Sequence, residues 1–240
     1  DTDRVFILRT VEDTLRIHKF IAENDVKSAV IAGGGYIGLE MAENLTEKGI
    51  SVTIVQRPNQ VMAPLDYDMA CQLHGLLRKK GITLKFGSSV TGFEEKDGLI
   101  LTTLKDDEPL KSDLVILAIG VTPDTALAKD AGLALGIKGS ITVNERMETS
   151  APDVYAVGDA VQVKNFVTGE DALISLAGPA NKQGRIAADN ICGLKSSYDG
   201  SQGSSVIKIF DMTAATTGIN EKTAKQLGID YDKVVLFPLS

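Results

Sequence analysis

Six residues beginning at Gly33 have the composition and spacing of a phosphate-binding turn. They follow the pattern G-x-G-x-x-G and read Gly33-Gly34-Gly35-Tyr36-Ile37-Gly38. In such a turn Gly33 permits the tight bend, Gly35 lets the backbone approach the phosphates, and Gly38 lets a helix pack closely on the preceding strand. The N–H groups and the dipole at the start of that helix favour a bound anion. The six residues therefore predict a dinucleotide pyrophosphate site.

Elements of the required type flank this turn in the required order. Residues 28–33 are apolar and predict a short strand, and residues 36–48 predict a helix that ends at Gly49. Residues 51–55 are mostly β-branched and predict the next strand, which gives a right-handed βαβ unit in a parallel sheet. The pattern alone is a weak signal, and a purely structural glycine turn is the alternative.

The remaining sequence predicts an α/β fold with one excursion. A hairpin is expected where residues 90–95 and 99–104 alternate around a Lys-Asp-Gly turn. The Gly/Ser-rich residues 195–205 indicate a boundary. We expect further helices at 10–24, 66–80, 179–192 and 220–227, and further strands at 82–86, 114–118, 154–157, 206–210 and 234–237.

The composition limits the classes of function. The 240 residues carry a net charge of −7 with 43% apolar and 24% charged residues, and no run of Lys or Arg is present. These features argue against a nucleic-acid surface. No apolar stretch is long enough for a membrane span and no signal peptide is visible. Only two cysteines are present, without C-x-x-C spacing, so we expect a location in the reducing cytoplasm. The chain lacks an initiator Met, which predicts that residues upstream have been removed.

The few cysteines and histidines predict neither a disulfide framework nor a metal site. Cys71 and Cys192 are far apart in the sequence and share no C-x-x-C spacing, so we expect packed thiols rather than nucleophiles. His18 and His74 lack ligand spacing and are expected at surface or half-buried helix positions. We therefore expect no metal ligands, and no catalytic residue is predicted within this sequence.

Three more segments accompany the glycine turn in a fixed order. They are residues 118–123 (AIGVTP), 149–160 (TSAPDVYAVGDA) and 176–185 (LAGPANKQGR). With the glycine turn, this set resembles the flavin-dependent pyridine nucleotide–disulfide oxidoreductases. The most similar branch holds coenzyme A disulfide and persulfide reductases, NADH oxidases and NADH peroxidases. Residues 166–169 and 176–190 look most like the coenzyme A disulfide and persulfide reductases.

The resemblance implies roles for residues around the glycine turn. Gly33, Gly35, Ile37 and Gly38 would bind NADH or NADPH, and at Gly120 a side chain would obstruct the dinucleotide. Tyr36 matches a tyrosine that covers the flavin until the nicotinamide displaces it, although core packing is the alternative. Glu40 matches a glutamate near the nicotinamide, although glutamate is common in a first helical turn because of the helix dipole.

The resemblance also implies a second group of residues, which would bind FAD. Asp159 matches an acid that accepts hydrogen bonds from the ribityl chain, and a carboxylate is a strong acceptor for hydroxyl donors. Aspartate after a strand and a glycine is also common in plain turns. Leu176, Ala177 and Ala180 match the segment beside the flavin ring, where a helix N-terminus would stabilise charge on the reduced flavin.

The end of the second strand departs from the family pattern. An NAD-preferring site usually has Asp or Glu there to hold the ribose 2′-hydroxyl. This chain has the uncharged Gln56, followed by Arg57, which is able to pair with a 2′-phosphate. A solvated loop arginine is an equally good interpretation of Arg57. Both residues are therefore candidate cofactor ligands, and the choice between NADH and NADPH is open.

The resemblance further implies that the sequence is a central fragment. The family begins with its own glycine fingerprint for FAD and then a redox cysteine, and neither is present here. We expect residues 27–145 to form an NAD(P)-binding domain with a Rossmann-like parallel sheet. Residues 1–26 and 146–203 would form part of the FAD-binding domain, and residues 204–240 the start of an α+β dimerisation domain.

The implied activity is hydride transfer from NAD(P)H through FAD to a cysteine-bound sulfur. The substrate would be coenzyme A disulfide, coenzyme A persulfide or a related small disulfide, and the full-length protein would be a homodimer. The fragment alone is expected to be inactive. An NADH oxidase or peroxidase is one alternative, and a non-catalytic nucleotide-binding redox module is another.

Overall fold

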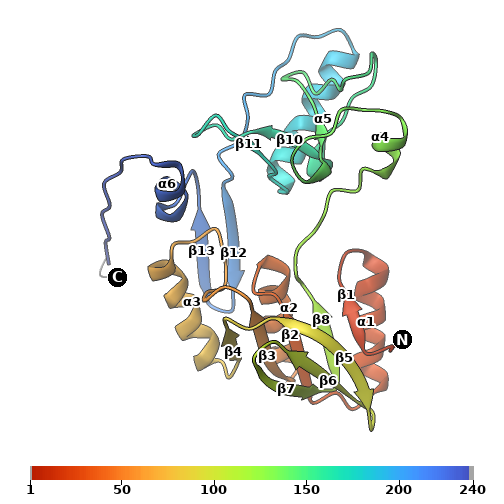
Figure 1. Ribbon diagram of the computed structural model, residues 1–240, viewed down its shortest axis with the longest axis vertical. Helices are drawn as coiled ribbons and strands as arrows, with labels where there is room; N and C mark the ends of the chain where they lie inside the picture. Colours follow the sequence, from red (N-terminus) through yellow and green to blue (C-terminus); the bar gives the residue numbers. More distant parts are fainter. Residues whose placement is uncertain (1, 238–240) are drawn as a thin grey trace. The chain divides into compact units, whose positions relative to one another are not determined.

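The computed structural model describes residues 2–237, which divide into two compact units (Figure 1). Among these residues, unit 1 contains 2–120 and 207–214, and unit 2 contains 121–206 and 215–237. The described part of residues 1–26, which were expected in the FAD-binding domain, thus groups in space with residues 27–120. The cofactor assignment of each domain stays a prediction.

Unit 1 is built on a five-stranded sheet in which all neighbouring strands are parallel. The strand order is β1-β8-β2-β3-β4. The strands are β1 (Val5–Ile7), β8 (Leu114–Leu117), β2 (Ser28–Ala32), β3 (Ser51–Gln56) and β4 (Thr83–Phe86). The parallel α/β sheet predicted from the sequence is confirmed, and β1 is a strand that the sequence analysis missed.

The two faces of this sheet bury different sets of side chains. On one face Ile31, Ile54 and Ile116 pack in a core with three helices, α1 (Val11–Glu23), α2 (Tyr36–Glu47) and α3 (Tyr67–Lys79). On the other face Val30 and Val115 pack against an antiparallel three-stranded meander (Figure 1). The meander consists of β5 (Val90–Lys96), β6 (Leu99–Leu104) and β7 (Asp107–Ser112). Both faces are covered, which explains why β2 and β8 are continuous apolar runs.

Unit 2 has little regular sheet and one long helix. Its core contains Ile141, Met147, Val161 and Ile186, all buried. Its elements are α4 (Ala126–Asp130), β9 (Ile141–Thr142), the 3-10 helices η1 (Ile137–Gly139) and η2 (Gly158–Ala160), β10 (Val161–Lys164), β11 (Asp171–Ala172), α5 (Ala177–Ile191) and α6 (Glu221–Leu227).

The hairpin of β12 (Ser205–Ile209) and β13 (Met212–Thr216) is divided between the two units. Its central part, residues 207–214, is grouped with unit 1, where Ile207 and Ile209 are buried in the same core as α2 and α3. Lys80, at the end of α3, lies over the Phe210 ring at 4.8 Å and pairs with Asp211 at 3.8 Å. Part of the segment expected to begin a separate dimerisation domain therefore packs on the parallel sheet unit.

Two expected strands are not formed. Residues 154–157 contain only an isolated bridge between Tyr155 and Glu148, because the neighbouring residues turn rather than extend. Residues 234–237 are described without regular structure, and their large side chains are mostly exposed. An apolar β-branched run predicts a strand only where a partner strand is present, and within residues 2–237 neither run has a ladder to join.

Candidate dinucleotide-binding site

The glycine turn lies at the carboxyl end of β2, where it is packed against the end of β8. Gly33 has φ +110°, and a Cβ atom built on it would lie 2.2 Å from the carbonyl oxygen of Ala118. A Cβ atom on Gly38 would lie 2.0 Å from the carbonyl oxygen of Gly33. Strand, turn and helix therefore approach too closely for any side chain at these two positions.

Gly35 has the opposite environment. A Cβ atom there would meet no atom of the described residues within 4 Å. Gly35 is also the N-cap of α2, and no side chain among residues 2–237 caps this helix end. The first N–H groups of a helix have no partner within the helix itself, and they carry the positive end of its dipole. The position that should admit phosphates is thus open, and the donors that would bind them lie beside it.

The turn also lies at a topological switch point of the sheet. From β2 the chain continues to β3 on one side, while β8 lies on the other side. Ligands of open α/β sheets bind at the carboxyl edge of such a switch. Gly120 follows β8 at this edge, is exposed, and has φ +110° with open space around its Cβ position. The structure therefore brings Gly120 to the same edge as the glycine turn.

Gln56 is occupied within the protein rather than extended into solvent. Its Oε1 accepts a hydrogen bond from the Gly34 N–H at 2.9 Å, and its Nε2 donates to the Gln60 carbonyl at 3.2 Å. The side chain thus connects the glycine turn to the loop that follows β3. The neighbouring Arg57 is exposed.

The loop of residues 57–65 is held by two buried side chains that the sequence analysis did not identify. Gln60 donates through Nε2 to the carbonyls of Met62 and Leu65, at 3.3 and 3.0 Å. His74 on α3 accepts the Val61 N–H through Nε2 at 3.2 Å, and burial lowers the pKa of its imidazole. The prediction of a surface or half-buried His74 is wrong, because the residue is only 3% exposed and its ring packs against those of Tyr67 and Phe86.

The other expected nicotinamide-site residues lie on the first turns of α2. Tyr36 is half-buried and packs against the core of unit 1, as expected from core packing, the alternative to a role beside the flavin. Ile37 is half-buried and Glu40 is exposed. The three share the helix that begins at the open end of the turn, so their roles in cofactor binding stay predictions.

The residues expected to bind FAD come together in unit 2. Leu176 is the N-cap of α5, and Ala177 and Ala180 lie in its first turn and a half. Asp159 is exposed in η2, and the Cβ of Ala180 lies 3.9 Å from where a Gly158 Cβ would be. Gln183 on α5 is buried and accepts the Gly158 N–H through Oε1 at 2.7 Å. A buried amide, absent from the expected residues, therefore joins the Asp159 loop to α5.

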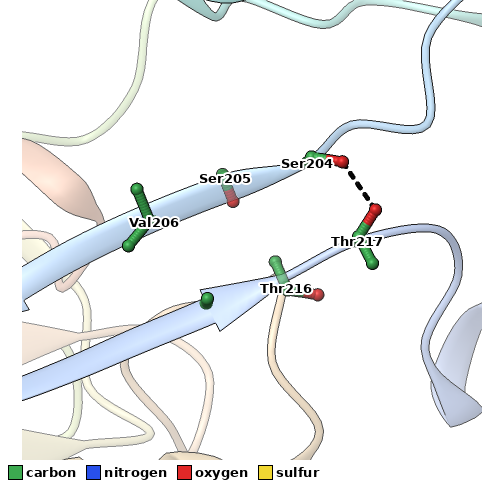
Figure 2. Close-up of a pocket in the computed structure, with 6 residues that line it drawn as sticks. Ser204, Ser205, Val206, Thr216 and Thr217 are labelled. Atoms are coloured by element: carbon green, nitrogen blue, oxygen red, sulfur yellow. Dashed lines mark hydrogen bonds between the residues drawn. The ribbon is translucent and has the colours of Figure 1, made fainter.

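The cavity of about 450 Å³ shown in Figure 2 is elsewhere, at the open end of the β12–β13 hairpin. Ser204 and Thr217 share a hydroxyl–hydroxyl hydrogen bond across it at 2.5 Å. Its lining is uncharged: Ser204, Ser205, Val206, Ala215, Thr216 and Thr217. Nothing in this lining favours a pyrophosphate.

Cysteine and metal chemistry add no further candidate within residues 2–237. Both cysteines are free, and Cys71 is half-buried. Cys192 is exposed, so the prediction of a packed thiol is wrong there; it caps the C-terminus of α5, where the chain meets solvent. Among the described residues no three His, Cys, Asp or Glu side chains gather as metal ligands would, and none of the described helices has the length and apolarity of a membrane span.

Residues 1–184 match the family model for pyridine nucleotide-disulphide oxidoreductases. The chain belongs to this family. Among solved structures, reduced CoADR-RHD of Bacillus anthracis is 49% identical, with a TM-score of 0.92 over 95% of this chain and 41% of that one. The family assignment confirms the resemblance drawn from the four sequence segments, and the structural likeness confirms the fold class.

Relatives of this oxidoreductase chain carry several names. The NADH oxidase of Methanocaldococcus jannaschii is 39% identical over 93% of this chain, and the CoA-dependent NAD(P)H sulfur oxidoreductase of Pyrococcus abyssi is 35% identical over 96%. The coenzyme A disulfide reductase of Staphylococcus haemolyticus is 31% identical over 98%. The chain covers 50%, 51% and 52% of these three proteins, so it spans about half the length of the curated relatives it matches.

Proposed function

We propose that this chain supplies the NAD(P)H-binding unit and part of the FAD-binding unit of a flavoprotein that reduces coenzyme A disulfide or persulfide. The observation that carries the proposal is the glycine turn. Gly33 and Gly38 are required by close packing, whereas Gly35 faces open space at an uncapped helix N-terminus. That arrangement fits a bound pyrophosphate.

The chain's own residues would bind and orient the cofactors. The α2 N-terminus would hold the dinucleotide phosphates, with Tyr36, Ile37 and Glu40 towards the nicotinamide. Asp159 would accept hydrogen bonds from the flavin ribityl chain, and the N-terminus of α5 at Leu176 would face the flavin ring. Nicotinamide and flavin supply the hydride and electron chemistry when bound, and the protein supplies position and electrostatics.

The names of the relatives support the sulfur substrate. Two of those described above act, by name, on sulfur or coenzyme A disulfide, and the 49% identical structure is a CoADR. For the full-length protein we propose coenzyme A disulfide or persulfide as substrate, NADH or NADPH as donor, a homodimeric assembly and a cytoplasmic location. A specific observation favours a second candidate, since the relative of 39% identity is named NADH oxidase. In that case oxygen would accept the electrons.

The test is an anaerobic titration of the full-length protein with NADH and with NADPH, in the presence of coenzyme A disulfide or coenzyme A persulfide. We expect consumption of reduced nucleotide matched by release of coenzyme A thiol. Consumption that needs oxygen or peroxide would favour the oxidase or peroxidase. Binding of nucleotide with no turnover by any acceptor would contradict an enzyme and leave a nucleotide-binding module.

A further inference from the structure

We propose that Gln56 is a positioning residue, which holds the glycine turn and the loop of residues 57–65 ready for the dinucleotide. It would therefore not be a ligand of the adenosine ribose, which is the role that its place at the end of β3 suggests. The inference rests on the proposed function, because it concerns the same nucleotide site.

The argument begins with the two hydrogen bonds of the Gln56 amide. One end accepts from the Gly34 N–H, inside the glycine turn, and the other donates to the carbonyl of Gln60, inside the loop. A primary amide carries both an acceptor and a donor. An ionised carboxylate has only acceptors, so the acid typical of an NAD site is unable to make the second bond.

Other contacts show that the loop and the turn are one structural unit. The Met62 N–H donates to the Gly34 carbonyl at 2.8 Å. A Cβ atom on Gly34 would lie 2.7 Å from the Val61 side chain, so the two backbones are closely packed. Gln60 and His74 fix the far side of the loop through the hydrogen bonds described above. Gly34 thus receives three contacts from the loop side, and its neighbour Gly35 is the position open to phosphates.

This arrangement assigns the ordering of the turn and the discrimination between nucleotides to two different residues. Gln56 orders the turn and carries no charge, so it has no preference between a ribose hydroxyl and a phosphate. Arg57 is the only charged residue among residues 57–65. Any discrimination between NADH and NADPH at this loop would therefore come from Arg57.

The sharpest test is Gln56→Glu in the full-length protein, because the two roles predict opposite signs. A ribose ligand would bind NADH more tightly as Glu, since a carboxylate accepts from ribose hydroxyls. A positioning residue would lose the bond to Gln60 and place a charge against its carbonyl. We expect Kd for NADH to rise roughly fivefold to tenfold. We expect Kd for NADPH to rise at least as much, because the new carboxylate also repels the 2′-phosphate.

A second variant and a second measurement separate positioning from general stability. Gln56→Met should raise KM for both nucleotides equally and leave kcat at saturation within about twofold, because the loss of one or two hydrogen bonds is then offset by bound nucleotide. In the ligand-free protein, amide hydrogen exchange should quicken at Gly34 and in residues 57–65 but not in the meander. Gln72→Met, at an exposed glutamine on α3, is the matched control. It should change neither KM for the nucleotides nor the rate of hydrogen exchange.

Three results would overturn the inference. They are tighter NADH binding by Gln56→Glu, unequal effects of Gln56→Met on the two nucleotides, and unchanged exchange at Gly34 in Gln56→Met. If the wild-type protein bound neither nucleotide, the proposed function would fall together with this inference. If the wild type bound normally and only Gln56→Glu gave tighter NADH binding, the inference alone would fail.

Discussion

At the scale of single residues, the glycines of the turn are needed for different reasons, and substitution separates them. Gly33→Ala would combine a left-handed φ of +110° with a Cβ atom 2.2 Å from a backbone oxygen. We expect a loss of more than about 2 kcal/mol in the free energy of unfolding, measured by denaturant titration.

Gly35→Ala should behave in the opposite way. Its φ of −86° suits alanine, and the new methyl group would meet open space. We expect a melting temperature near that of the wild type but nucleotide binding weaker by about tenfold or more, because the methyl group occupies the space for the phosphates. Isothermal titration with NADH and NADPH measures this. Unchanged affinity in a folded variant would show that the pyrophosphate does not bind at this turn.

Arg57 gives a second prediction at residue scale. A guanidinium pairs with a phosphate through charge-assisted hydrogen bonds. If it faces the 2′-phosphate, Arg57→Gln should weaken NADPH binding about tenfold and leave NADH binding nearly unchanged. The ratio of the two Kd values, measured at low and at high salt, is the readout. Equal small effects would leave Arg57 as a solvated loop residue.

His74 predicts a dependence of stability on pH. Burial, and to a lesser extent the charge of Arg78, hold its pKa below the usual value of 6.5. The unfolded chain therefore binds more protons than the folded one between the lowered pKa and 6.5. Its stabilising contribution is complete above pH 6.5 and is lost as the pH falls from there towards the lowered pKa. Protonation would also remove the acceptor for the Val61 N–H.

His74→Gln is the matched variant for this pH effect. The glutamine carbonyl retains an acceptor for the Val61 N–H but does not titrate. We expect the free energy of unfolding to fall less steeply below pH 6.5 than in the wild type, as measured by urea denaturation at several pH values. If the free energy of unfolding fell equally steeply with pH in both proteins, the pKa of His74 would be the same in the folded and the unfolded state, which would contradict this prediction.

At the scale of elements, the junction of η2 and α5 depends on one buried side chain. Gln183 accepts the Gly158 N–H, and Gly158 immediately precedes Asp159. Gln183→Leu would leave that N–H without its acceptor, at a cost of about 1–3 kcal/mol. We expect the full-length variant to fold but to retain less FAD, measured from the flavin absorbance per protein. Ala188→Gln, at an exposed position of the same helix, should retain the full amount. Equal flavin content in both variants would show that the hydrogen bond between Gln183 and Gly158 does not contribute to flavin binding.

At the scale of the whole molecule, the chain corresponds to about half the length of its relatives. Disulfide reduction by this family, as the resemblance implies, also needs a second glycine fingerprint and a redox cysteine, which these 240 residues do not contain. We expect the isolated 240-residue polypeptide to bind nucleotide at best and to show no NAD(P)H-dependent disulfide reduction in stopped-flow measurements. Turnover by this polypeptide would contradict the proposal that this chain only binds cofactors and that residues outside it are needed for disulfide reduction.

The parallel βαβ unit, the glycine turn and the family were all predictable from the order of the amino acids. Each of these is a local pattern: apolar runs of fixed length, glycines at fixed spacing, and segments in a fixed order. The capping box that begins α1, in which Thr10 accepts from the Asp13 N–H at 3.2 Å and Asp13 accepts in return, was predictable for the same reason.

The contacts of Gln56, His74 and Gln183, in contrast, could be identified only in the folded protein. Their partners are the Gly34, Val61 and Gly158 N–H groups, which are 22, 13 and 25 positions away in the sequence. A polar side chain looks the same in a sequence whether it faces solvent or a buried N–H group. The packing of distant segments determines which backbone groups lose water, and those groups then determine which side chains must satisfy them.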